Sequence, residues 1–233
     1  MLAALTKIHY SSDWHFDKVK HVYTIHNLAF QGNFPKDILG YCLGLSFKYY
    51  EDGSMRYDGG ISFMKTCIVY SDKVTTVSPS YAKEILTPEY GEHLDEILRY
   101  RQHDLWGIVN GIDVTEWNPQ TDKLLAKNYT AKNVAKGKKD NKLAVQKALG
   151  LREAPDVLMI GMVSRLTYQK GVYLIAERLA DIMGLDIQFV VLGTGEEDAE
   201  STFRYMEEKY KRRAVYYCGY NEQPYLLWFY NRR

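Results

Sequence analysis

The chain has 233 residues, of which 46% are hydrophobic and 25% charged, and its formal net charge is +1. This balance is ordinary for a globular protein, and it offers no excess of positive charge that would favour nucleic acid or an anionic membrane as a partner. The three cysteines, Cys42, Cys67 and Cys218, form no CxxC zinc pair, and no run approaches about 18 apolar residues, so we expect a cytoplasmic protein without a membrane segment.

The first half of the chain mixes short strands and helices with polar loops. The predicted elements are a helix over 1–10, a strand over 22–26, a helix over 59–70, a strand over 72–77, a helix from 79 to about 86 and a short strand over 106–109. Ser78 is a favoured N-cap residue, and Pro79 is favoured at the first helical position. Residues 88–104 are charged and predict an irregular segment. The polar stretch 118–139 is where we expect the chain to cross between domains.

Strands and helices alternate in the second half. The predicted elements are helices over 141–149, 172–183 and 196–210 and strands over 157–163, 187–192 and 214–218. This order is typical of right-handed βαβ units around a parallel sheet, and it predicts an α/β fold.

The loop at 164–171 contains two cations, Arg165 and Lys170, between a predicted strand and a predicted helix. Ligands of α/β proteins bind outside the carboxyl ends of the strands, and fixed cations near a helix N-terminus suit a diphosphate. A pair of solvated surface charges explains the same spacing equally well.

Small residues follow the next predicted strand, where Gly193 and Gly195 would let the backbone approach a ligand closely. A tight turn between strand and helix is the alternative explanation. His26 ends the strand over 22–26, and a histidine at that position is more often a hydrogen-bonded structural residue than a functional one.

Several motifs make the chain resemble the bacterial and plant starch and glycogen synthases that use ADP-glucose. The matching stretches are 23–32 (YTIHNLAFQG), 72–82 (DKVTTVSPSYA), 87–91 (TPEYG), 110–113 with 117–119 (NGID and WNP), 164–171 (SRLTYQKG) and 192–195 (LGTG). They follow the family's order from about residue 2 to 222, whereas residues 223–233 depart from the family's pattern.

The resemblance implies a GT-B type fold of two Rossmann-like α/β domains with parallel sheets. Residues 1–118 would be the C-terminal portion of the acceptor-side domain, and residues 119–233 the first half of the nucleotide-sugar-binding domain. Nothing matches the family's Lys-x-Gly-Gly-Leu loop or its Glu-x-x-Gly segment. We therefore expect both domains to be incomplete and the chain to be a fragment of a synthase.

The implied reaction is retaining transfer of glucose from ADP-glucose to the non-reducing end of an α-1,4-glucan. By resemblance, Arg165 and Lys170 would hold the diphosphate as catalytic residues. His26 would lie against the donor glucose, Asn110 near the acceptor, and Gly193 and Gly195 near the nucleotide. No metal and no other cofactor is expected, since ADP-glucose is a substrate and Arg and Lys replace the metal in such enzymes.

Two interpretations of the function stay open. The first is a glucan synthase, although we expect the 233-residue chain by itself to be inactive. The second is a catalytically silent remnant that at most binds nucleotide or glucan weakly. The sequence leaves open glycogen or starch as product, ADP or UDP in the donor, and the oligomeric state.

Overall fold

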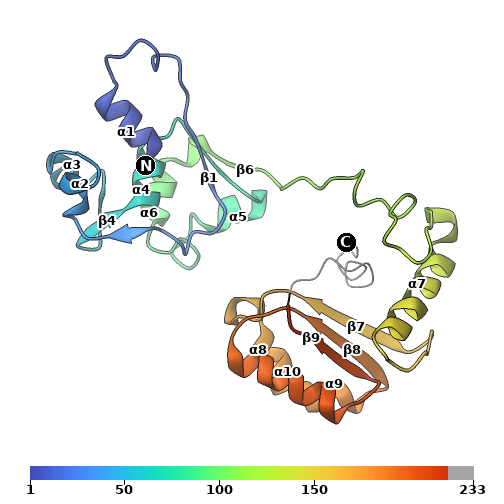
Figure 1. The fold of residues 1–233 in the computed structure, drawn as a ribbon. Helices are drawn as coiled ribbons and strands as arrows, with labels where there is room; N and C mark the ends of the chain where they lie inside the picture. The colour runs from blue at the N-terminus through green and yellow to red at the C-terminus, as the bar shows by residue number, and fades with distance from the viewer. Residues whose placement is uncertain (220–233) are drawn as a thin grey trace. The chain divides into compact units, whose positions relative to one another are not determined.

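The computed structural model describes residues 1–219 and divides the chain into two compact units, Met1–Gly111 and Ile112–Arg233 (Figure 1). The division falls earlier than the expected one between residues 118 and 119. Pro119 already belongs to the second unit, because its carbonyl accepts hydrogen bonds from the backbone and side-chain amides of residues 128–129. The expected departure of residues 223–233 from the family's pattern lies outside the described residues.

The first unit is built on a three-stranded parallel sheet of order β1-β5-β6. Its strands are β1 Val22–Ile25, β5 Lys73–Thr76 and β6 Leu105–Gly107. The strands predicted from residue 22 and from residue 72 are confirmed, and the third begins at Leu105, one residue earlier than expected. Ile25 and Val74 are fully buried, and they pack with apolar residues of the helices into one core.

A small antiparallel sheet was missed by the sequence pattern. The prediction of a helix over 59–70 is wrong in its first turn, because β4 Gly60–Ser62 pairs there with β2 Asn33–Phe34 and β3 Arg56–Tyr57. Helix α4 begins only at Phe63 and ends at Tyr70. Ser62 has an extended backbone and accepts a hydrogen bond from the Lys65 amide, so it is the N-cap that starts the helix.

The prediction of an irregular segment over 88–104 is also wrong. Helix α6 spans Asp95–Tyr100, and a short 3₁₀ turn, η1, follows at Gln102–Asp104. The helix forms because Leu94 and Leu98, four residues apart, are buried together in the core of the first unit. The other helices of this unit are α1 Leu2–His9, α2 Ile38–Tyr41, α3 Lys48–Glu51 and α5 Pro79–Glu84. The predicted Ser78 cap of α5 is confirmed by hydrogen bonds of 3.2 and 3.3 Å.

The second unit contains a parallel sheet of order β7-β8-β9, with strands Leu158–Val163, Ile187–Leu192 and Ala214–Tyr217. The central strand β8 is buried throughout because helices cover both of its faces. Its odd-numbered residues, such as Phe189, pack towards α8 Val172–Glu177, α9 Leu179–Gly184 and α10 Glu197–Lys209 (Figure 1). Its even-numbered Val190 packs with Val145 of α7 Val134–Ala148.

Two helix predictions for this unit are corrected by the structure. Helix α7 begins at Val134 rather than 141, because Thr130 and Asn133 form a capping box around the 3₁₀ turn η2 Ala131–Asn133 that leads into it. The helix expected over 172–183 is divided into α8 and α9, since Arg178 leaves the helical backbone conformation. No helix within residues 1–219 combines the length and the apolar composition needed to cross a membrane.

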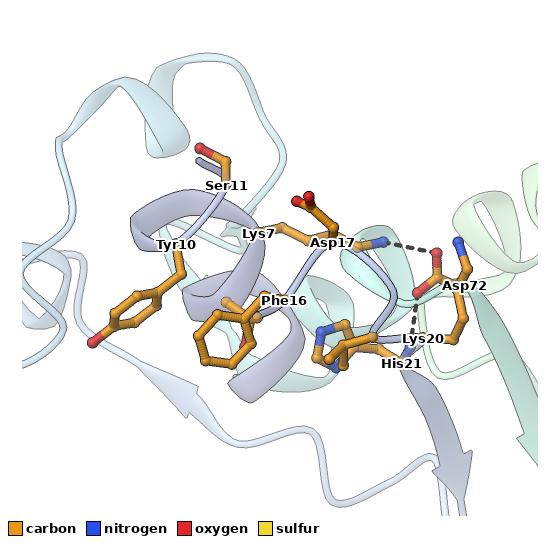
Figure 2. Close-up of a pocket in the computed structure, with 10 residues that line it drawn as sticks. Lys7, Tyr10, Ser11, Phe16, Asp17, Lys20, His21 and Asp72 are labelled. Atoms are coloured by element: carbon orange, nitrogen blue, oxygen red, sulfur yellow. Dashed lines mark hydrogen bonds and ion pairs between the residues drawn. The ribbon is translucent and has the colours of Figure 1, made fainter. Parts of the chain in front are cut away.

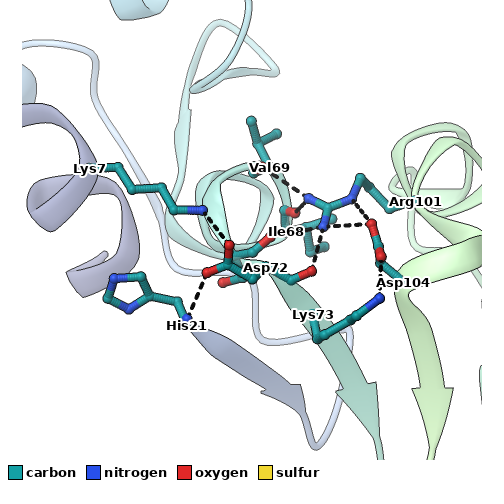
Figure 3. A network of polar contacts seen from close by, with 9 residues as sticks. Lys7, His21, Ile68, Val69, Asp72, Lys73, Arg101 and Asp104 are labelled. Atoms are coloured by element: carbon teal, nitrogen blue, oxygen red, sulfur yellow. Dashed lines mark hydrogen bonds and ion pairs between the residues drawn. The ribbon is translucent and has the colours of Figure 1, made fainter. Parts of the chain in front are cut away.

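Asp72, at the start of β5, ties three segments of the first unit together (Figure 3). Its carboxylate accepts a hydrogen bond of 2.8 Å from the His21 amide, just before β1, and pairs with Lys7 of α1 at 3.2 Å. The hydrogen bond from the His21 amide, with the help of Lys7, holds the pKa of Asp72 below its ordinary value.

This pKa shift makes the stability of the first unit depend on pH. A carboxyl group whose pKa is lower in the folded state than in the unfolded state stabilises the fold at pH values above its unfolded pKa of about 3.9. This contribution to the free energy of unfolding is lost as the pH falls through the pKa of the folded state. We expect Asp72→Asn to lower the free energy of unfolding by about 1 kcal/mol at pH 7 and by less at pH 3. Urea titrations of both proteins at the two pH values measure this. An equal difference at both would contradict the prediction.

Candidate functional site

The carboxyl ends of β7, β8 and β9 enclose a pocket of about 320 Å³ in the second unit. In a parallel sheet these ends all lie at one edge, and ligands of α/β proteins bind there. The residues that line the pocket are Val163, Ser164, Arg165, Leu192, Gly193, Thr194 and Gly219. Arg165 and Gly193, predicted from separate motifs, are therefore brought together, whereas Lys170 and Gly195 do not line the pocket.

Backbone hydrogen bonds fix the loop that carries Arg165. The Ser164 amide donates to the Leu192 carbonyl at 3.1 Å, and the Leu166 amide donates to the Thr194 carbonyl at 2.9 Å. The Leu166 carbonyl accepts from the Glu196 amide at 2.8 Å, and the Leu166 side chain is fully buried in the core of the unit. Since its neighbour Leu166 points inward, Arg165 is left on the exposed side of the loop.

The two glycines permit this close approach of the loop. A Cβ atom on Gly193 would lie 1.9 Å from the Ser164 carbonyl oxygen, and one on Gly195 would lie 2.0 Å from that of Leu166. Both positions therefore require glycine for packing between two backbone segments. This is the tight-turn explanation given above, and the contact of either glycine with a nucleotide stays a prediction.

The side chains of Arg165 and Lys170 are both exposed, and neither side chain forms an ion pair or a hydrogen bond with another residue of the described part of the chain. Arg204 of the same unit, by contrast, pairs with Glu197 and Glu200. Two unpaired cations on one loop are available to an anionic ligand. This availability distinguishes them from cations that only stabilise the fold.

Carboxylates on the neighbouring turn were not predicted from the sequence. Glu200 is buried and accepts a hydrogen bond of 2.9 Å from the Gly195 amide, which lowers the pKa of Glu200. Glu196 accepts from the Tyr168 amide and, together with Asp198, from the hydroxyl of Tyr173. These partners lie 23 to 28 residues apart in the chain, so no local pattern identifies them.

In the first unit, His26 directly follows β1, and Asn110 lies three residues beyond Gly107, the last residue of β6. Both are at the carboxyl end of the parallel sheet, and both side chains are exposed. The His26 imidazole has no hydrogen-bond partner among residues 1–219, which argues against the structural role considered above. Their contacts with a substrate stay predictions.

A second pocket, of about 270 Å³, lies at the opposite end of that sheet, beside α1 and the loop before β1 (Figure 2). Figure 2 shows Tyr10 and Phe16 beside one another there, and Lys7 and the His21 amide both bonded to the Asp72 carboxylate. No predicted site residue lines this pocket. Within the described residues, no three His, Cys, Asp or Glu side chains gather in a way that could hold a metal ion.

Comparisons with known proteins relate the chain to one enzyme group. Residues 1–100 match the family model of the starch synthase catalytic domain. The chain is 49% identical to the glycogen synthase of Ligilactobacillus salivarius, over 84% of this chain and 41% of that protein. It is 48% identical to the Clostridium perfringens glycogen synthase, over 92% of this chain and 44% of that one.

The fold is similar to a solved structure of the same group, the catalytic domain of starch synthase IV from Arabidopsis thaliana bound to ADP and acarbose. The TM-score is 0.84 at 33% sequence identity, covering 95% of this chain and 46% of that one. This match confirms the GT-B type α/β fold with parallel sheets. The chain thus spans less than half the length of each of these three relatives.

Proposed function

Because this chain is related to the glycogen and starch synthases, we propose that it acts in retaining transfer of glucose from ADP-glucose to the non-reducing end of an α-1,4-glucan. The observation that carries the proposal is Arg165, a cation without an ion-pair partner among residues 1–219, at a pocket between the carboxyl ends of three parallel strands. The similarity to these synthases is our reason for assigning a nucleotide sugar, rather than another anion, as the ligand of Arg165.

In the proposed reaction, the bond between the anomeric carbon and the diphosphate oxygen breaks, and negative charge develops on the departing ADP. Cations that are already in place stabilise this charge without reorganising at the moment of reaction. Arg165 is held in place by the backbone hydrogen bonds of its neighbour Leu166, and Lys170 lies further along the same loop. We assign both residues to the diphosphate.

The remaining groups would complete the donor and acceptor sites. We propose that His26 contacts the donor glucose and that Asn110 lies near the glucan, since both are exposed at the carboxyl end of the first unit's sheet. Gly193 lines the pocket and would face the nucleotide, and Gly195 lies two residues further along the same turn. The proposed partners are therefore ADP-glucose and an α-glucan.

Binding of nucleotides to the 233-residue chain, followed by isothermal titration calorimetry, tests the donor side of this proposal. We expect ADP to bind at least about fivefold more tightly than AMP, because the second phosphate adds charge that the two cations neutralise. Arg165→Gln should remove that preference. Lys211→Gln, an exposed lysine beyond α10 at the amino end of β9, is the matched control and should keep it.

Glucose transfer is tested in a chimaera in which this chain replaces the matching stretch of the Clostridium perfringens relative. Incorporation of labelled glucose from ADP-glucose into glycogen, above an Arg165→Gln chimaera, is the expected result, and UDP-glucose is compared alongside. A chimaera that folds and binds ADP but transfers no glucose would overturn the proposal in favour of a silent nucleotide-binding chain.

A further inference from the structure

The two halves of the cationic loop are held in different ways. Arg165 lies in the half that is bonded to the strand ends through Ser164 and Leu166. Lys170 lies in the 3₁₀ turn η3, Tyr168–Lys170, whose backbone bonds are local: the Lys170 amide donates to Thr167 at 2.9 Å and the Gly171 amide donates to Tyr168 at 3.0 Å. Local bonds shape a turn, but they do not fix its position against its neighbours.

Among the described residues, the one hydrogen bond from this turn to a distant segment goes to a single carboxylate. The Tyr168 amide donates to Glu196 at 3.3 Å, and Glu196 is the residue that precedes α10. The hydroxyl of Tyr173, in the first turn of α8, makes a hydrogen bond to the same carboxylate and lies 3.0 to 3.1 Å from both oxygens of Asp198. We call Tyr173, Glu196 and Asp198 the tyrosine clamp.

The charges of the clamp favour this arrangement. A tyrosine hydroxyl has one hydrogen to donate, so the two carboxylates share it. Their charges are further stabilised by the N-terminus of α10, a helix of 13 residues. The hydrogen bond to Glu196, and the carboxylates themselves, raise the pKa of Tyr173 far above its usual value, so the hydroxyl stays protonated and remains a donor.

We propose that Tyr173 is a positioning residue that holds the Lys170 half of the loop in place for the diphosphate. This inference rests on the proposed function of the loop. Without the hydroxyl, Glu196 and Asp198 would face one another with no donor between them, and like charges repel. Glu196 is exposed, so it can turn towards solvent and release the Tyr168 amide, and with it the turn that carries Lys170.

Hydrogen exchange of the full chain tests the clamp without any nucleotide. Tyr173→Phe keeps the ring and removes the hydroxyl, and it should speed exchange of the amides at 168–171 about tenfold. Tyr168→Phe is the matched control: it makes the same substitution five residues earlier, on an exposed ring whose hydroxyl bonds to no other described residue. It should leave exchange unchanged, and circular dichroism should show both variants folded.

A double-mutant cycle on ADP binding tests whether the clamp acts through Lys170. Tyr173→Phe should weaken ADP binding about fivefold and leave AMP binding within about twofold of wild type. In a Lys170→Gln background the same substitution should have no further effect on ADP, because the group that it misplaces is gone. Tyr168→Phe should leave both affinities unchanged.

The outcomes separate this inference from the proposed function. Unchanged exchange at 168–171 in Tyr173→Phe, or losses that add in the double variant, would overturn the positioning role while the loop still binds ADP. Failure of the wild-type chain to bind ADP would overturn the proposed function and the use of the clamp for a diphosphate. In that case the exchange difference between the two variants still decides whether Tyr173 fixes the loop.

Discussion

Lys170→Ala is expected to lower kcat for glucose transfer by the chimaeric synthase by about 10²- to 10³-fold and to leave KM for the glucan within about twofold. The physical reason is that negative charge on the leaving diphosphate develops mainly in the transition state, so a cation that neutralises it acts on turnover more than on binding. Lys170 is exposed and has no ion-pair partner in the described chain, so its removal leaves no buried charge behind.

Initial rates at varied glycogen concentrations and a fixed, saturating concentration of ADP-glucose measure kcat and the KM for glycogen separately. Lys211→Ala is the control, since it removes the same charge at the other end of the sheet. Its kcat should stay within about twofold of the unmodified chimaera. A loss that is confined to the KM for glycogen would place Lys170 on the acceptor and refute the assignment to the diphosphate.

Arg101→Met is expected to lower the free energy of unfolding of the first unit by about 3 kcal/mol. The guanidinium lies where α4 ends, and Figure 3 shows it between the end of that helix and Asp104. It donates to the carbonyls of Ile68, Val69 and Ser71 at 2.6 to 3.0 Å and to the Asp104 carboxylate at 3.2 Å. Its side chain is only 13% exposed, so water cannot replace these bonds freely.

Removal of Arg101 would leave the last carbonyls of α4 without donors, which a helix end does not tolerate when it is buried. Arg99→Met is the matched control two residues away. Arg99 pairs with Asp95 at 2.7 Å, but its side chain is 45% exposed, so its loss should cost less than about 1 kcal/mol. Urea unfolding followed by circular dichroism compares the two variants, and Arg101→Lys should rescue little, since lysine lacks the planar fork. Equal losses in the two methionine variants would contradict this account.

The sequence alone determined the framework of the second unit. The run at 187–192 predicts a strand, which the structure confirms as β8, and the alternation of strands with helices predicts the parallel sheet. The loop at 164–171 comes directly after the strand predicted over 157–163. The position of Arg165 at the carboxyl end of that strand could therefore be predicted. Motif resemblance then supplied the enzyme family, which periodicity cannot supply.

Contacts between distant segments were decided only by the tertiary structure. Residues 60–62 form a strand rather than a helical turn because β2 and β3 pair with them. Helix α6 forms because Leu94 and Leu98 are buried in the core of the first unit. Local helix propensity contributes little free energy compared with the burial of apolar side chains. Over the six residues of α6 it is too small to decide the conformation.

The same reason explains what the sequence left open or missed at the site. Gly193 and Gly195 were predicted, but only the structure shows that the Ser164–Leu166 backbone packs against them. Tyr173 was missed, because its partners Glu196 and Asp198 are distant in the chain. A hydrogen bond between residues 23 or more positions apart has no local period, so only the folded chain shows it. The sequence thus determined which residues carry the charge, and the tertiary structure determined what holds that charge in place.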